Sequence, residues 1–140
     1  MSDSLFDAEP LRTVPEVVEP EKMTAGERLR RRQAARIASG LHPLSMNGAI
    51  IRLLDGPRPL DKGQAGHAGP YKSCGDCVFR QAIPGGNRDF PKCVFGARTV
   101  TRTWGGPQTY VYTERPRASH SESSDVRAWW PACVNFEATP

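Results

Sequence analysis

The chain has no long apolar run. No part of its 140 residues approaches the roughly 18 consecutive apolar residues that indicate a membrane span. The segment from Met1 to Asp7 is acidic, whereas a signal peptide has a basic start and an apolar centre. We therefore expect a cytoplasmic protein without a membrane partner.

The sequence also lacks the residue patterns of catalysis. Its three histidines, His42, His67 and His120, stand in separate segments with no metal-ligand spacing between them. There is no Walker loop, no nucleophile elbow and no segment of paired carboxylates. His120 near Asp125 is the one candidate general base, and an exposed histidine in a serine-rich loop is usually structural. We therefore expect no enzyme and no small-molecule substrate.

Large apolar side chains are scarce as well. Hydrophobic residues make up 38% of the chain, and the 13 prolines and 13 glycines favour loops. An ordered unit of this composition buries too little apolar surface to be stable by itself, so small proteins of this kind commonly add a metal ion or disulfides. The sequence therefore predicts a cross-linked fold.

Four cysteines supply donors for such a cross-link. The motif Cys-Gly-Asp-Cys begins at Cys74, and two further cysteines follow it. A pair with this spacing can bind one tetrahedral ion from a single turn of backbone, and two more thiolates complete the shell of a structural zinc site. Reducing conditions in the cytoplasm disfavour disulfides. We predict zinc, with an iron–sulfur cluster as the alternative, on Cys74, Cys77, Cys93 and Cys133.

Acidic residues dominate the start of the chain. Residues 1–21 hold six acidic residues against Arg12 alone, with prolines spaced by five. This composition offers too few apolar groups to offset the entropy of ordering. We predict a disordered acidic tail over residues 1–21.

A basic helix is predicted next, within residues 22–44. Thr24 and Glu27 have the spacing of a capping box, and Gly40 with Pro43 supplies the stop. Such a helix can bind nucleic-acid phosphates without reading their sequence. Alternatively, it is a solvated surface helix, or a helix that lies on an acidic protein surface such as that of its own tail. The arginines assigned to the partner are Arg28, Arg30, Arg31, Arg32 and Arg36.

Residues 45–70 connect this helix to the cysteine-bearing half. The run from Ala49 to Leu54 is the most apolar of the chain, and it predicts either a buried strand or a short helix, which periodicity cannot distinguish. Residues 55–70 are rich in glycine and proline and are typical of a linker. We place a boundary near residue 70.

The remaining residues, 71–140, are predicted to form a zinc-ribbon-like module rich in β-hairpins. One hairpin turns at Pro-Gly-Gly-Asn within residues 78–93, and a second turns at Trp104 within residues 94–113. One turn of helix over residues 126–130 should deliver the last cysteine. The predicted fold class is small α+β. The side chains expected to pack over the metal are Trp129, Trp130 and Phe136.

Several of these stretches resemble a known group of proteins. They are residues 32–44, the cysteine pair at Cys74, the Phe-Pro-Lys-Cys motif at Phe90, and the Ser-Ser-Asp-Val-Arg-Ala-Trp-Trp-Pro-Ala-Cys motif over residues 123–133. The chain resembles, over residues 24–137, uncharacterised small four-cysteine proteins encoded by phages and prophages of actinobacteria. The resemblance implies a phage origin, a bacterial host cytoplasm and a four-cysteine site, and it implies no activity. The long interval before the last cysteine suggests that the Trp104 hairpin is an insertion.

Two classes of function remain open from the sequence. The first is a zinc-stabilised module that binds nucleic acid through its Arg-rich helix. The second is a phage-encoded adaptor or inhibitor that binds a host protein, for which Trp129, Trp130 and Arg127 are typical anchor residues. For the two tryptophans, packing over the metal is the favoured expectation, because a module this small needs its largest side chains as core.

Overall fold

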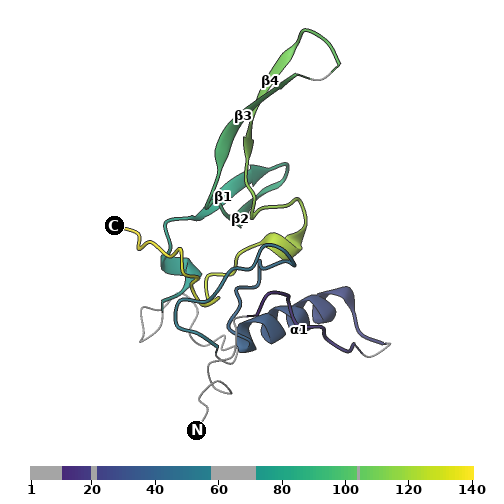
Figure 1. The fold of residues 1–140 in the computed structure, drawn as a ribbon, viewed down its shortest axis with the longest axis vertical. Coiled ribbons are helices and arrows are strands. Elements are labelled where there is room, and N and C mark those ends of the chain that lie inside the picture. Colours follow the sequence, from purple (N-terminus) through teal and green to yellow (C-terminus); the bar gives the residue numbers. More distant parts are fainter. Residues whose placement is uncertain (1–10, 20–21, 58–71, 104) are drawn as a thin grey trace.

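The computed structural model describes residues 11–19, 22–57, 72–103 and 105–140. In these ranges the chain forms one α-helix, two antiparallel hairpins and two 3-10 turns (Figure 1). The predicted class, small α+β, is confirmed, and its zinc-ribbon character stays a prediction. The elements are α1 (Ala25–Ala38), η3 (Cys74–Asp76), β1 (Arg80–Gly85), β2 (Arg88–Cys93), β3 (Arg98–Thr103), β4 (Thr109–Glu114) and η4 (Glu122–Ser124).

Helix α1 begins and ends where the sequence predicts. The Thr24 hydroxyl accepts a hydrogen bond from the Glu27 backbone N–H at 3.2 Å, which satisfies one of the free N–H groups of the first turn. At the other end Gly40 has a φ of 84°, a left-handed conformation that glycine adopts without strain. The Leu41 backbone N–H then bonds back to the Arg36 carbonyl at 2.8 Å, which closes the helix.

The apolar segment that follows α1, residues 49–54, is neither a regular strand nor a helix. These were the two alternatives that its sequence did not distinguish. The segment runs extended and pairs with its neighbours through isolated bridges, Leu41 with Arg52 and Leu53 with Cys133. The His42 backbone N–H donates to the Ile51 carbonyl at 2.7 Å. Each partner is itself irregular, so the pairing stops after one or two residues and no regular strand develops.

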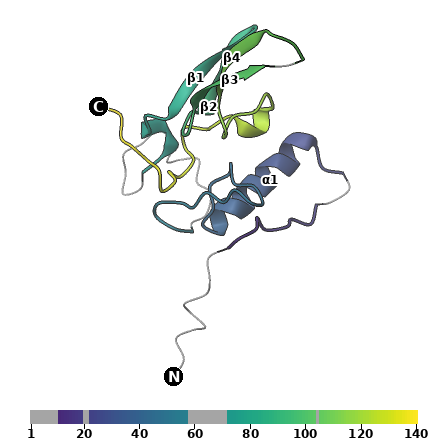
Figure 2. The same cartoon turned by 45° about the horizontal axis from the view of Figure 1, so that its top comes forward.

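Both predicted hairpins are confirmed. Strands β1 and β2 pair from Arg80↔Cys93 to Gly85↔Arg88, and the β3–β4 hairpin extends beyond the rest of the molecule (Figure 1). In both views α1 and the hairpins lie at opposite ends of the body, with the irregular segments between them (Figure 2). Trp104, at the predicted second turn, lies outside the described residues.

The predicted helix over residues 126–130 is wrong. A 3-10 turn, η4, comes earlier, and the Ser121 hydroxyl caps it by accepting from the Ser123 backbone N–H. The Val126 backbone N–H donates to the Pro91 carbonyl at 2.7 Å. In a helix the Val126 carbonyl would accept from the Trp130 N–H, but here it accepts from the Arg80 side chain at 2.8 Å, and the chain stays irregular up to residue 130.

One hydrophobic cluster joins parts of the chain that the sequence separates. It combines Ile37 of α1 and Leu53 of the apolar segment with Cys74, Val126 and Trp130 of the C-terminal half. Ile37 and Trp130 have no exposed surface. The boundary placed near residue 70 therefore does not divide the core, and the linker predicted over residues 58–70 lies outside the described residues.

Part of the predicted acidic tail lies along the helix. Residues 11–19 have no regular secondary structure, and they run beside α1 in both views (Figures 1 and 2). The Leu11 carbonyl accepts from Arg52 at 3.0 Å, and the Val14 backbone N–H donates to Asn47 at 2.9 Å. The disorder predicted for residues 1–10 and 20–21 concerns parts of the tail that lie outside the described residues.

Ile37→Ala tests whether α1 and the C-terminal half share one core. We expect a loss of about 3 kcal/mol in the free energy of unfolding, because the substitution leaves a cavity in a fully buried site. All three tryptophans lie in the C-terminal half, so denaturant unfolding followed by tryptophan fluorescence should shift together with the loss of helix followed by circular dichroism. Leu54→Ala, at a side chain 44% exposed, is the control and should cost less than about 1 kcal/mol. A fluorescence transition unchanged by Ile37→Ala would show that the helix is a separate unit.

Candidate metal centre

The four cysteines line a single small cavity. Its volume is about 20 Å³, which is the space of one water molecule or one ion. All four thiols are free, with Cys74 and Cys133 buried and the other two half-buried. The wall also includes His42 and Arg117. The fold thus brings together, from three stretches of chain, the four residues that the sequence singled out.

The Cys-Gly-Asp-Cys motif forms a tight knuckle. It is the 3-10 turn η3, closed by a hydrogen bond from the Cys77 backbone N–H to the Cys74 carbonyl at 3.1 Å. Gly75 sits so close to Ala128 that a Cβ atom there would lie 3.0 Å from the Ala128 Cβ and carbonyl oxygen. A side chain at this position would therefore crowd the segment that carries Cys133, which would have to move by a few tenths of an ångström.

Backbone pairing brings Cys133 to the knuckle. The Cys74 backbone N–H donates to the Trp130 carbonyl at 2.9 Å, and Ser73 bridges to Pro131. On its other side the segment pairs with Leu53. Cys133 is thus held by hydrogen bonds from two directions, without a helix.

A buried ion pair fixes β2, which ends at Cys93. The Lys92 ammonium lies 2.6 Å from the Asp125 carboxylate, and the side chains are only 7% and 4% exposed. Lys92 also donates to the Ser124 hydroxyl at 2.8 Å and to the Ser121 carbonyl at 3.0 Å. Asp125, the partner that the sequence offered to His120, is therefore engaged elsewhere.

The cavity disfavours thiolates unless a positive charge enters it. Burial raises the pKa of the Cys74 thiol well above its usual value, and the three other cysteines raise it further. A bound cation reverses this effect, because a thiol that coordinates a metal ion is deprotonated. The four cysteines are therefore stable side by side as neutral thiols or as ligands of a metal ion. Thiolates without a metal ion would be unfavourable in this cavity.

His42 lies directly behind Cys74. Its Nε2 atom is 3.2 Å from the Cys74 Sγ, and its Nδ1 atom accepts a hydrogen bond from the Leu44 backbone N–H at 3.1 Å. Burial, helped by the charge of Arg117, lowers the pKa of His42 to about 3, so the ring is neutral near pH 7. The ring also packs edge-on against Trp130, with 5.5 Å between the ring centres.

Arg117 approaches two of the other sulfurs. Its Nη1 atom is 3.5 Å from the Cys133 Sγ, and its Nη2 atom donates to the Asn135 side-chain oxygen at 2.7 Å. Burial raises the pKa of Cys93, while hydrogen bonds from the Phe95 backbone N–H and from Arg117 act to lower it. The Arg117 guanidinium is therefore placed to stabilise negative charge on both Cys93 and Cys133.

The sulfurs as placed do not form a coordination shell. Within the described ranges, no group of three or more His, Cys, Asp or Glu side chains is arranged to hold a metal ion. The donor set fits zinc in its chemistry, since four sulfur ligands backed by hydrogen-bond donors are typical of structural zinc. Zinc on these cysteines stays a prediction.

Three of the α1 arginines that the sequence assigns to a partner contact other parts of this chain. The Glu19 carboxylate lies 2.7 Å from the Arg32 guanidinium and 3.6 Å from that of Arg28. Arg36 donates to the Pro43 carbonyl at 2.7 Å, and burial together with the Arg32 charge lowers its pKa. The remaining predicted partner residues, Arg30, Arg31 and Arg127, are exposed.

The aromatic residues expected over the metal lie near the cavity but not on its wall. Trp130 is in the core, where its ring packs against His42. Trp129 packs edge-on against Trp130, with 6.5 Å between ring centres. Phe136 lies beneath the Lys72 ammonium, 5.8 Å from the ring centre. The aromatic side chain on the wall is Phe79, which the sequence did not single out.

His42 and Arg117 are the site residues that the sequence did not indicate. His42 stands 32 positions before Cys74, and Arg117 stands 16 before Cys133, so no local motif connects either residue to the cysteines. Comparison of the chain with models of protein families, with curated proteins and with solved structures finds no match.

Replacing Lys92 tests the ion pair beside Cys93. Lys92→Met should lower the free energy of unfolding by about 3 kcal/mol, because it leaves Asp125 charged and buried without its partner. Lys92→Met combined with Asp125→Leu should recover part of the loss, because both charges then leave together. Arg88→Met removes a cation that is 66% exposed and 4.0 Å from Asp125, and it should have little effect. Equal losses for Lys92→Met and Arg88→Met in denaturant titrations would contradict this role.

Proposed function

We propose that this chain is a phage-type binding module whose fold is fastened by one zinc ion on Cys74, Cys77, Cys93 and Cys133, and that it associates with nucleic acid through α1. The observation that carries the proposal is the convergence of four free thiols on one cavity of about 20 Å³. The zinc ion would link the knuckle, the end of β2 and the C-terminal segment in a zinc-ribbon-like arrangement.

Three features favour a single structural ion. The cavity holds something the size of one water molecule, whereas an iron–sulfur cluster of several iron and sulfide atoms needs more room. A small core with few large apolar groups gains most from a metal that links distant segments. The four thiols are a closed donor set, which suits a structural role better than a catalytic one.

The charge of α1 supports an anionic partner. Two guanidinium groups, those of Arg28 and Arg32, converge on the single carboxylate of Glu19. An arrangement that holds one carboxylate between two arginines can hold a phosphate in the same way. Arg30 and Arg31 add two exposed charges on the same helix. Nucleic-acid phosphates would then compete with Glu19 for this pair.

The second candidate function is an adaptor or inhibitor that binds a host protein. The Glu19 contact also favours it, because Glu19 is a protein carboxylate, and an acidic protein surface could take its place. Trp130 is fully buried and cannot serve as an anchor, which leaves Arg127 and the half-buried Trp129 of the residues named for this role.

Elemental analysis tests the zinc ion. We expect about one zinc per chain after purification in reductant, and a serine at any one of the four cysteine positions should lower the zinc content and the melting temperature together. A chelator should produce the same loss of stability in the parent protein. If the purified protein contains iron and sulfide and is brown, the centre is an iron–sulfur cluster and not a zinc ion. A metal-free protein with unchanged stability would exclude both.

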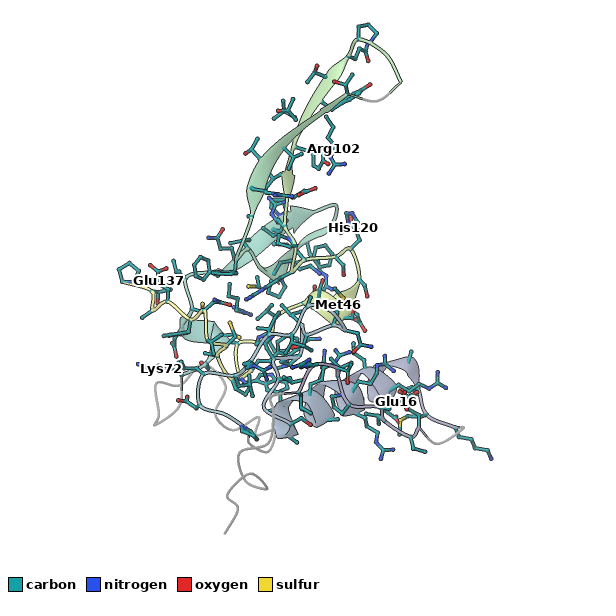
Figure 3. All side chains as sticks on the ribbon, viewed as in Figure 1. Glu16, Met46, Lys72, Arg102, His120 and Glu137 are labelled. Atoms are coloured by element: carbon teal, nitrogen blue, oxygen red, sulfur yellow. The ribbon has the colours of Figure 1, made fainter. Side chains whose placement is uncertain are left out.

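Glu19→Gln tests the partner surface. Freeing Arg28 and Arg32 should tighten binding to pooled DNA or RNA several-fold at low salt, and should steepen the dependence of log K on log salt by about 1 to 2. Glu16→Gln is a matched control, because it changes the net charge equally and Glu16 is exposed with no ion pair among the described residues. Glu16 lies beside α1, and Arg102 lies on the projecting hairpin (Figure 3).

Two outcomes would contradict the nucleic-acid partner. Equal effects of Glu19→Gln and Glu16→Gln would mean that only the net charge matters. Absence of binding by the parent protein at low salt would exclude nucleic acid and leave the host-protein adaptor, whose binding should vary little with salt if aromatic contacts dominate it.

A further inference from the structure

The four sulfurs differ in their hydrogen-bond donors. Cys74 faces the Nε2 atom of His42 at 3.2 Å. Cys133 faces Arg117 at 3.5 Å and the Asn135 backbone N–H at 3.4 Å. At Cys93, the Phe95 backbone N–H and Arg117 act to lower a pKa that burial raises. Among the described residues, no side chain or backbone N–H donates to the Cys77 sulfur, which is half-buried.

The tautomer of His42 makes it a donor and not a metal ligand. The Leu44 backbone N–H can only donate, so the Nδ1 atom that receives it at 3.1 Å carries no proton. A neutral ring then carries its proton on Nε2, the atom that faces Cys74. An N–H group directed at sulfur stabilises the thiolate, whereas a ligand nitrogen would need that lone pair free.

Arg117 is held in place as a counter-charge. Its guanidinium stacks over the Phe95 ring, 4.4 Å from the ring centre, and its Nη2 atom is fixed by Asn135 at 2.7 Å. A zinc ion with four thiolates carries a net charge of about −2, which is unfavourable in a buried site. The arginine offsets part of that charge on the side of Cys93 and Cys133.

We propose that His42 and Arg117 are positioning residues of the metal centre. They hold three sulfurs as thiolate ligands of low nucleophilicity and leave Cys77 as the most nucleophilic sulfur of the centre. The inference rests on the zinc site proposed above. Hydrogen bonds and positive charge withdraw electron density from a thiolate and lower its reactivity. A sulfur without a donor keeps its electron density, so Cys77 is where the centre should react first with an electrophile.

Limited alkylation of the zinc-loaded protein by iodoacetamide tests this order. The sulfur electron pair attacks the methylene carbon, a sulfur–carbon bond forms, the carbon–iodine bond breaks and iodide leaves. Mass spectrometric mapping should find Cys77 modified several-fold faster than the other three cysteines. This measurement needs no variant. If Cys93, which is also half-buried, reacts as fast or faster, the proposal is overturned.

Arg117→Gln separates the donor effect from exposure. It should raise the alkylation rates of Cys93 and Cys133 toward that of Cys77, and it should weaken zinc affinity about 10- to 100-fold in chelator competition. Arg117→Lys keeps the charge but loses the two hydrogen-bonding arms of the guanidinium. Its alkylation rates and zinc affinity should lie between those of the parent protein and of Arg117→Gln. Arg115→Gln is the control, because the Arg115 side chain makes no ion pair or hydrogen bond within the described residues.

Zinc content, measured first, distinguishes the two ways of failing. A parent protein without zinc overturns both the zinc site and this inference. A parent protein that holds zinc, but whose affinity and labelling order are the same with Arg117→Gln as with Arg115→Gln, overturns the inference alone. If Arg117→Gln does not fold, the labelling order of the parent protein and of Arg117→Lys still decides the question.

Discussion

Backbone pairing of residues 130–134 with two other stretches holds the molecule together. This segment bonds to the cysteine knuckle through the Trp130 carbonyl and to the apolar segment through the Ala132 carbonyl, which accepts from Leu54 at 2.9 Å. A buried segment outside helices and sheets must satisfy its backbone groups in this way. The pairing also explains why Cys133, Leu53 and Cys74 meet, although they lie far apart in the sequence.

The core that results is small and placed directly against the cysteines. Cys74 belongs to the hydrophobic cluster with Ile37 and Trp130, so the same side chain contributes to the packing and to the cavity. A change in the state of the thiol therefore acts on the core without any intervening element. Because so few large apolar side chains are available, stability and the chemistry of the sulfurs are coupled.

The parts of this fold that could be predicted are those with local signals. Thr24 and Glu27 mark the start of α1, and the alternation of strand residues around glycine turns marks both hairpins. The contacts of His42 and Arg117 could not be predicted, because they depend on bridges of one or two residues that leave no periodicity. The helix expected near Trp130 fails for a related reason: the Val126 carbonyl, which would accept from Trp130 in a helix, accepts from the distant Arg80 side chain instead.

The projecting β3–β4 hairpin presents less positive charge to a partner than α1 does. Its register places Arg98 opposite Glu114, and that carboxylate lies 2.9 Å from Arg98 and 3.3 Å from Arg102. Both arginines are exposed, so these pairs add little stability, but they reduce the charge that the hairpin presents to a polyanion. On α1, by contrast, one glutamate faces two arginines while Arg30 and Arg31 stand exposed beside them. The excess positive charge of the described chain is therefore better placed on the helix than on the hairpin, and a polyanion should meet α1 first.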